Sequence, residues 1–338
     1  MAMYALWLAL GNNIFCKTLR ASTIKEYVWA VATFIMLFSQ YDPRKIHDMD
    51  KNVCPHLQAI FAELDRYDKV PHRREPFSMD MMRLAKEEAV TIRAVAPLGW
   101  RAALVDWYEV GLAAGNRKIE WAQDQGIWDP AKVHKNVYGD TYAFCLNDVR
   151  GETADGRRMK GGLAVWRARD TIRKVWITYR YQKNGDNGEE RLHVRNDNPG
   201  GHCFVSAMMR ILDRFITLRG SADTTTPLAI YRCERSGRDK CINGNLIKGH
   251  MRLLAAKAYG FDITKPSSDY EEVKRWSSHS LRVGACTTLH GMGFNGTSIK
   301  WLLRWKSDAF MVYLRNLTVL GIRQNEALDK AAAMPHFY

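Results

Sequence analysis

Strand-forming patterns are confined to one stretch of the chain, and this restriction constrains the fold more than any other feature. Residues 184–188 read Asn-Gly-Asp-Asn-Gly, and the segments on either side, 175–181 and 191–194, contain β-branched and aromatic residues. This combination is typical of a β-hairpin. A third strand is expected at residues 142–146. The sequence therefore predicts a mainly α-helical chain with a small three-stranded antiparallel β-sheet.

Outside this stretch, apolar residues recur mostly at helical spacing. A helix is expected over residues 1–10, and the chain after residue 200 is expected to be helical to its end. The predicted helix starts before the strands are Ser22 or Thr23, Asp50 or Asn52, and Ser78.

Two prolines bracket a charged stretch, Val70 to Pro76, which is typical of a linker between domains. A chain of 338 residues corresponds to about two domains, at roughly 100–200 residues per domain. We therefore expect a small helical domain over residues 1–72 and a larger domain over residues 73–338.

The charge of the chain is strongly positive and unevenly divided. Fifty Lys and Arg against 36 Asp and Glu give +14. Residues 1–75 hold ten basic and eight acidic residues, for +2, so residues 76–338 hold 40 and 28, for +12. Such an excess indicates a polyanionic partner, most often nucleic acid. On charge alone, a well-solvated surface explains the excess equally well.

The composition excludes several classes of protein. Hydrophobic residues make up 46% and charged residues 25%, which excludes disorder and collagen-like repetition. No uninterrupted apolar run reaches the roughly 18 residues that span a bilayer. Seven cysteines, none in C-x-x-C, indicate neither a disulfide framework nor a zinc ribbon. We therefore expect an intracellular protein that acts without a membrane.

The densest group of chemically active residues lies near the C-terminus, where Ser277 or Ser278 is a plausible cap of one helix and Ser307 the expected cap of a later one. His279 and Arg282 are three residues apart, so they share the first-turn face of the expected helix. The free N–H groups of that turn favour a phosphate. Taken singly, these residues and the Trp and Tyr that follow are more often surface pairs or core residues.

Taken together, the order His-x-x-Arg, then Trp, then Tyr eight residues later resembles the second motif of the tyrosine recombinases. Residues 304–315, Arg-Trp-Lys-Ser-Asp-Ala-Phe-Met-Val-Tyr-Leu-Arg, are most similar to the crypton-type recombinases of eukaryotic mobile elements. Many family members have Leu-Gly where this chain has Leu303-Arg304. The resemblance implies a phosphate-binding arginine, an acid/base, a residue in the His/Trp position and a nucleophile at Arg282, His279, Trp305 and Tyr313 respectively.

The same resemblance implies a first motif upstream, an arginine after a glycine turn with an acidic residue three positions later. Gly115-Asn116-Arg117 followed by Glu120 supplies it, although such a pair is also an ordinary contact at a helix start. Arg117 is then the first catalytic arginine and Glu120 its support. The family also places a catalytic lysine on a β-hairpin, which implies Lys183, with Lys174 as the reserve.

The resemblance covers roughly residues 75–320 and implies a DNA recombinase or integrase that forms a 3′-phosphotyrosyl intermediate. Its implied partners are double-stranded DNA and three further copies, a homo-tetramer on two duplexes. No metal, no cofactor and no small-molecule substrate is expected, and in a eukaryote the nucleus is the expected location. Side chains expected to hold the DNA backbone are Arg73, Arg74, Arg232, Arg235, Arg238, Lys240, Lys248 and Arg252.

Two other functions stay open. One is a non-catalytic DNA-binding descendant of a recombinase, and the complete set of six catalytic residue types argues against it. The other is a DNA-relaxing enzyme like the type IB topoisomerases. The crypton-like wording and the fit of residues 1–72 to a core-binding domain that clamps DNA argue against that function.

Overall fold

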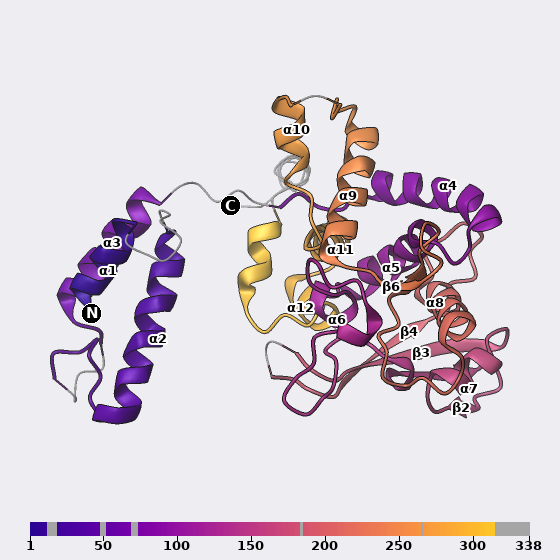
Figure 1. Ribbon diagram of the computed structural model, residues 1–338, viewed down its shortest axis with the longest axis horizontal. Helices are drawn as coiled ribbons and strands as arrows, with labels where there is room; N and C mark the ends of the chain where they lie inside the picture. The colour runs from indigo at the N-terminus through magenta and orange to yellow at the C-terminus, as the bar shows by residue number, and fades with distance from the viewer. Residues whose placement is uncertain (12–18, 48–51, 69–73, 183–184, 265, 315–338) are drawn as a thin grey trace, which may run out of the picture. The chain divides into compact units, whose positions relative to one another are not determined.

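The computed structural model describes residues 1–11, 19–47, 52–68, 74–182, 185–264 and 266–314. The chain forms two compact units, Met1–His72 and Arg73–Tyr338, and Figure 1 shows the elements of each. The prediction of a mainly helical chain with a small antiparallel sheet is confirmed.

The first unit contains helices α1 (Ala2–Ala9), α2 (Ala21–Ser39) and α3 (Pro55–Tyr67). Helix α2 follows Arg20 without a side-chain cap, so neither Ser22 nor Thr23 caps it. Helix α3 begins at Pro55, whose fixed φ suits the first helical position, and not at Asn52; Asp50 lies outside the described residues. The core that joins the three helices consists of Ala5, Leu8, Ile24, Val28, Leu57 and Phe61.

Helix α2 is, within the described residues, the one helix long and apolar enough to cross a membrane by length and composition alone. Its mean hydropathy over 18 residues is 1.2, although Lys25 and Glu26 interrupt its apolar run. The same test is passed by core helices and by signal sequences. In this structure, one face of α2 contributes Ile24 and Val28 to the core of the first unit.

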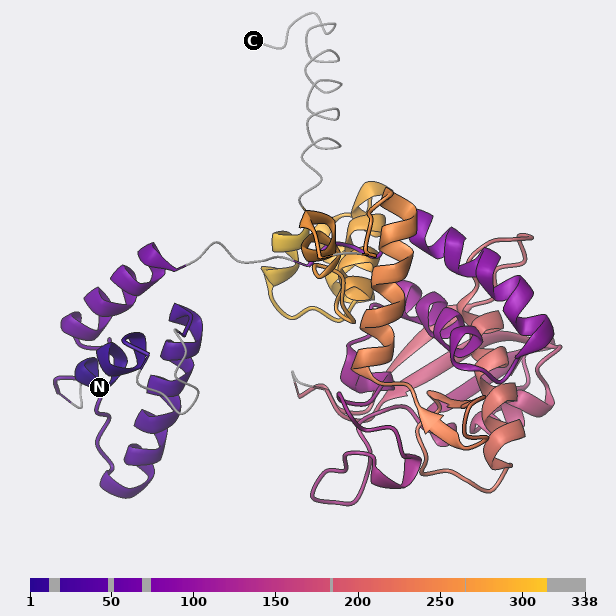
Figure 2. The same ribbon diagram turned by 45° about the horizontal axis from the view of Figure 1, so that its top comes forward.

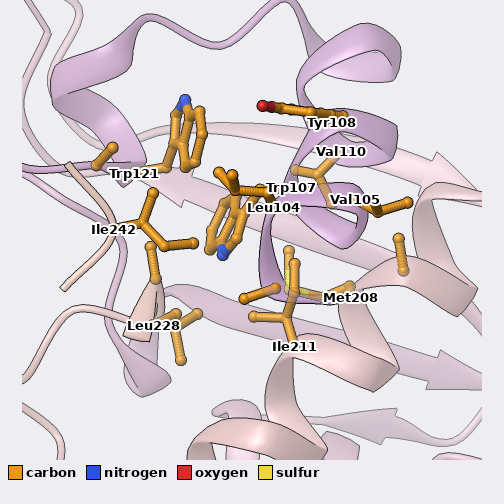
Figure 3. Close-up of a cluster of buried hydrophobic side chains, with 14 of the residues drawn as sticks. Leu104, Val105, Trp107, Tyr108, Val110, Trp121, Met208, Ile211, Leu228 and Ile242 are labelled. Atoms are coloured by element: carbon orange, nitrogen blue, oxygen red, sulfur yellow. The ribbon is translucent and has the colours of Figure 1, made fainter. Parts of the chain in front are cut away.

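The second unit is built around helix α5 (Trp100–Ala114), most of whose residues are buried. Helices α4 (Met79–Val95) and α8 (Phe204–Arg219) pack against it, and α9 (Gly244–Tyr259) packs on α4. Figure 3 shows the core beside α5, where the rings of Trp107 and Trp121 stack with their centroids 5.2 Å apart. As predicted, Ser78 caps α4, because its hydroxyl accepts the Met81 N–H.

The main sheet has four strands, which corrects the prediction of three. Its order is β2 (Arg158–Met159), β1 (Val149–Thr153), β3 (Ile172–Tyr179) and β4 (Glu189–Val194), all antiparallel. The predicted hairpin is β3–β4. Helix α8 covers the apolar side of this sheet, where β3 presents alternate buried residues.

The strand expected at residues 142–146 is wrong. The Phe144 N–H donates to the Glu120 carbonyl, while the Phe144 carbonyl accepts from Leu228 N–H, so its partners come from two unrelated segments. The Cys145 N–H donates to the Asp148 carboxylate at the start of a short 3₁₀ turn. The chain is therefore buried here without joining a ladder.

A further hairpin, β5 (Ile230–Arg232) with β6 (Asp239–Cys241), interrupts the region expected to be helical. Four of the side chains expected to hold the DNA backbone, Arg232, Arg235, Arg238 and Lys240, lie on this hairpin or in its turn. The remaining short elements of the middle region are α6 (Lys118–Trp121), η1 (Pro130–Lys132), η2 (Leu146–Asp148) and α7 (Gly162–Arg167).

The last described elements form a separate small module with its own apolar cluster of Ala285, Cys286, Ile299, Leu303 and Phe310. It comprises α11 (Ser280–Gly291), α12 (Gly296–Leu302) and the 3₁₀ helix η3 (Asp308–Tyr313), after the short α10 (Ser268–Val273). Figure 2 shows these yellow and orange elements gathered at one end of the second unit. Helix α11 packs on α5, where a Cβ on Gly111 would lie 2.9 Å from the Leu281 side chain. It also lies close to the segment before α4, since a Cβ on Gly284 would lie 2.3 Å from the Phe77 carbonyl oxygen.

Candidate active site

The first motif is positioned by the glycine that ends α5. Gly115 has φ 59, a left-handed conformation that glycine adopts readily, and a Cβ there would meet the Leu303 side chain at 2.7 Å. The turn leads to Arg117, the N-cap residue of α6. The Glu120 carboxylate accepts the Arg117 backbone N–H at 2.7 Å and the Arg117 guanidinium at 3.2 Å. Glu120 therefore holds Arg117 through both its backbone and its side chain.

Arg282 lies in the first turn of α11 and is only 1% exposed. Its guanidinium donates to the carbonyls of Gly115 and Arg304 and lies 4.2 Å from the centre of the Trp305 ring. Within the described part of the chain, no carboxylate forms an ion pair with it. Burial, with the positive charges of Arg117 and Arg304 nearby, lowers the pKa of Arg282 to about 9. A buried cation without a carboxylate partner is a natural site for an anion.

His279 and Tyr313 meet directly. The Tyr313 hydroxyl lies 2.9 Å from His279 Nε2, although the two residues are 34 positions apart. Burial, with the charges of Arg282, Arg74 and Arg117, lowers the pKa of His279 to about 4, so its imidazole is neutral at physiological pH. Burial raises the pKa of Tyr313. The pair is therefore a neutral imidazole beside a protonated hydroxyl.

Trp305 lies between the second arginine and the tyrosine. Its ring centroid is 5.6 Å from that of Tyr313 and 4.2 Å from the carbon of the Arg282 guanidinium. The Trp305 Nε1–H is buried and has no hydrogen-bond partner among the described residues. Buried donors are normally paired. An unpaired one at this place suits a ligand oxygen.

Local structure explains how the second motif is displayed. His279 is the N-cap residue of α11, and the helix begins at Ser280, so neither Ser277 nor Ser278 caps it. Ser307 does cap the element that carries Tyr313, as expected, and that element is a 3₁₀ helix. Six predicted residues are thus brought into one cluster through contacts with one another or through Arg304: Arg117, Glu120, His279, Arg282, Trp305 and Tyr313.

The two lysine candidates have different outcomes. Lys183 lies outside the described residues, although the preceding Gln182 contacts the cluster through Arg304. Lys174 forms a cross-strand ion pair with Glu152 at 2.7 Å. It is five residues from Tyr179, the end of β3 that reaches the cluster, which is about 17 Å along a strand. Lys174 is therefore not part of this cluster.

Arg304 is the member of the cluster that the sequence did not indicate as a site residue. It is 4% exposed and donates to both carboxylate oxygens of Glu120 at 2.9 Å. The only feature of the sequence that set Arg304 apart was its position, where many family members have the glycine of a Leu-Gly pair. Its burial depends on residues far away in the sequence.

The residues expected to bind DNA fall into two groups. Arg74 and Arg252 both donate to the Lys274 carbonyl. The pKa of Lys248 is lowered mainly by burial and further by the charges of these two arginines. Arg74 also acts on the pKa of His279, so this first group borders the cluster. The second group lies on or beside the β5–β6 hairpin: Arg232, which pairs with Asp239, together with Arg235, Arg238 and Lys240. Arg73 lies outside the described residues.

No protein-family model and no curated protein matches this chain. Among solved structures, it is similar to the Tn1549 transposon integrase in complex with circular intermediate DNA. That match has a TM-score of 0.42 and 13% identity and covers 92% of this chain and 78% of that one. This chain is also similar to a tyrosine-to-phenylalanine variant of the same integrase in complex with transposon right-end DNA. That match has a TM-score of 0.44 and 14% identity, and it covers 93% of this chain and 78% of that one. These values describe a distant likeness.

Proposed function

We propose that this chain is a tyrosine recombinase that cuts and rejoins DNA strands through a 3′-phosphotyrosyl intermediate. The observation that carries the proposal is the convergence of the His279–Tyr313 pair with a buried, uncompensated arginine, Arg282. A hydroxyl beside a neutral acceptor is a nucleophile with its base. A buried cation beside that hydroxyl supplies the place for the anionic group that it attacks.

The reaction begins with the Tyr313 hydroxyl, which forms a bond to the scissile phosphorus while its proton passes to His279 Nε2. Arg117 and Arg282 hold the non-bridging oxygens with charge-assisted hydrogen bonds, and the Trp305 indole adds a neutral donor. The bond from phosphorus to the 5′ oxygen breaks, and that oxygen takes a proton from Lys183. Reversal of these steps by a 5′-hydroxyl rejoins the strand. One phosphodiester replaces another, so the exchange needs no external energy source.

The charge balance of the cluster supports a phosphate as the ligand. The cluster holds three guanidiniums and the carboxylate of Glu120, which pairs with Arg117 and Arg304 and acts on Arg282 only through its charge. This leaves an excess of two positive charges in a mostly buried place. A phosphodiester and the charge that develops on it during attack would offset that excess.

Trapping the covalent complex tests the proposal. A duplex with a nick close to the cleavage position loses a short fragment after attack, so the enzyme cannot rejoin the strand and stays attached. We expect a protein–DNA adduct on a denaturing gel when the strand on the 5′ side of the scissile phosphate is labelled, because that strand keeps the phosphate joined to the tyrosine. Absence of any adduct across a library of duplexes would contradict the proposed chemistry. Release of supercoils without exchange between duplexes would instead favour a relaxing enzyme.

DNA binding is expected to weaken steeply with salt, because residues 76–338 carry +12 and phosphate contacts release counterions. A chain that makes about 6–10 such contacts loses roughly 10³–10⁵ in affinity between 50 and 200 mM salt. Fluorescence anisotropy with a labelled duplex measures this slope. A flat dependence would show that the basic excess is not a DNA-binding surface.

Trp305→Phe is expected to slow cleavage by about 10²–10³, because it removes one preorganised donor and keeps an aromatic ring against Arg282. Trp301→Phe is the matched control, since the Trp301 side chain is exposed on α12. Single-turnover cleavage of nicked DNA measures both rates. Equal rates for the two variants would remove Trp305 from the mechanism.

The acid limb of the pH profile is expected well below the usual position for histidine. His279 must be unprotonated to accept the tyrosine proton, and its pKa is lowered to about 4 by burial and nearby arginines. Activity should therefore hold down to about pH 5 and fall as pH drops through the folded-state pKa. The pH profile of kcat/KM reports this group in the free enzyme. A half-maximum near pH 6.5, the ordinary value for histidine, would contradict the role of His279.

We also propose a subfamily, a cellular location and an assembly for this recombinase. The wording of residues 304–315 supports a crypton-type enzyme of a eukaryotic mobile element, acting in the nucleus. The resemblance supports a homo-tetramer on two duplexes, with residues 1–72 as the core-binding domain. Sedimentation of the protein with and without a two-site DNA tests the tetramer.

A further inference from the structure

Arg304 has a backbone conformation that is uncommon for a side-chain-bearing residue. Its φ is 56, in the left-handed region where glycine is the usual residue. It connects the end of α12 to Trp305 and is 4% exposed. Such a conformation persists only where surrounding contacts hold it.

Those contacts are made by its guanidinium. Nη1 and Nη2 donate to the two carboxylate oxygens of Glu120, each at 2.9 Å, and Nη1 also donates to Gln182 Oε1 at 2.9 Å. The guanidinium carbon lies 3.5 Å from the centre of the Tyr179 ring. A planar fork is needed to meet both carboxylate oxygens at once.

This arrangement limits the contact between the Glu120 carboxylate and the Arg117 guanidinium. With both oxygens engaged by Arg304, Glu120 makes a single side-chain contact to Arg117, at 3.2 Å from one nitrogen. The Arg117 side chain keeps 23% of its surface exposed, whereas that of Glu120 keeps 2%. Most of the Arg117 guanidinium is therefore not engaged by the carboxylate.

We propose that Arg304 is a positioning residue that occupies the Glu120 carboxylate and so leaves the Arg117 guanidinium available to a DNA phosphate. The inference rests on the proposed function. Without Arg304, Arg117 is the only cation among the described residues that forms an ion pair with the buried carboxylate of Glu120. It then competes with the scissile phosphate for the same guanidinium.

The backbone of Arg304 adds a second effect on the site. Its carbonyl accepts from the Arg282 guanidinium at 3.4 Å, and Trp305 follows it directly. One residue thus bears on both phosphate-binding arginines, on Arg117 through its side chain and on Arg282 through its carbonyl. The test separates the side-chain effect, which a substitution removes, from the backbone effect, which it leaves in place.

The test compares Arg304→Gln with the double variant Glu120→Gln plus Arg304→Gln. Each is assayed on nicked DNA that carries either a normal phosphodiester or a neutral methylphosphonate at the scissile position. Arg173→Gln is the matched control, because Arg173 is a partly exposed arginine of β3 that pairs with Asp197. Circular dichroism reports whether each variant folds.

Arg304→Gln is expected to slow cleavage of the phosphodiester by roughly 10², about the effect of losing one preorganised donor. On the methylphosphonate, which lacks one negative charge, the loss should be much smaller, since less depends on Arg117. The double variant should recover most of the rate, because a neutral amide no longer competes for Arg117. It also contains no unpaired buried carboxylate, so it remains testable if the single variant fails to fold.

Three results would overturn the inference. Equal losses on both substrates would assign Arg304 a purely structural role. The second result concerns the folded double variant. If it cleaves no faster than the folded single variant, or does not cleave at all, Glu120 does not compete for Arg117. Failure of the unmodified enzyme to form any adduct would overturn the proposed function itself, which distinguishes that failure from the other two.

Discussion

Replacing Tyr313 with phenylalanine is expected to abolish covalent attachment to DNA while leaving the folded second unit nearly intact. The variant loses one oxygen and keeps the ring that packs near Trp305. The lost hydrogen bond to His279 is worth about 0.5–1.5 kcal/mol. DNA affinity should also persist, because lysine and arginine contacts to phosphates dominate it. Denaturing gels of nicked-DNA reactions measure the adduct.

Tyr270→Phe provides the control for this variant, since Tyr270 is a partly exposed tyrosine on α10. It removes a hydroxyl of the same kind from outside the cluster, and its adduct yield should equal that of the unmodified protein. An adduct that survives in Tyr313→Phe would assign the nucleophile to another residue. The role of the whole second motif would then be wrong.

Asp106→Asn is expected to destabilise the second unit by about 3–5 kcal/mol, because it removes the charge from a fully buried carboxylate that binds three arginines. Arg93 from α4 and Arg210 from α8 each reach one oxygen at 2.6 Å, and Arg214 reaches the other at 2.5 Å. The variant leaves Arg214, only 5% exposed, without a carboxylate. Urea unfolding measures the loss.

Asp213→Asn is the matched control on α8. Its exposed carboxylate accepts one hydrogen bond from the Trp166 indole, so the expected loss is about 1 kcal/mol or less. Similar losses for the two variants would contradict the account of Asp106 as the central anion joining α4, α5 and α8. The proposed catalytic cluster includes none of these residues, so a destabilised but folded Asp106→Asn should still form the adduct.

The parts of the fold that were predicted from the sequence are those with strong local signals. The Asn-Gly turn and its β-branched flanks gave the β3–β4 hairpin, and Ser78 and Ser307 were recognised as helix caps. Strand β1 was missed because its sequence, Val-Arg-Gly-Glu-Thr, is short and polar. Its Gly151 is closely packed, since a Cβ there would lie 3.0 Å from side-chain atoms of Val165 and Ile172. Such a contact between distant segments leaves no local pattern.

The site was predictable only as far as its motifs carry a fixed order of residue types. His279 and Tyr313 were named from that order, and the structure adds that they meet at 2.9 Å. Arg304 was not named, because its role depends on Glu120 and Gln182, which lie 184 and 122 residues away. The same long-range burial lowers the pKa of His279, which no spacing predicts.

The measurement that tests the central claim most directly is to identify the residue joined to DNA. The trapped adduct is digested with nuclease and protease, and the peptide that keeps a nucleotide is sequenced by mass spectrometry. The account predicts one modified peptide, with a 3′-linked nucleotide on the oxygen of Tyr313. A nucleotide on any other side chain, or one linked through its 5′ end, would contradict it.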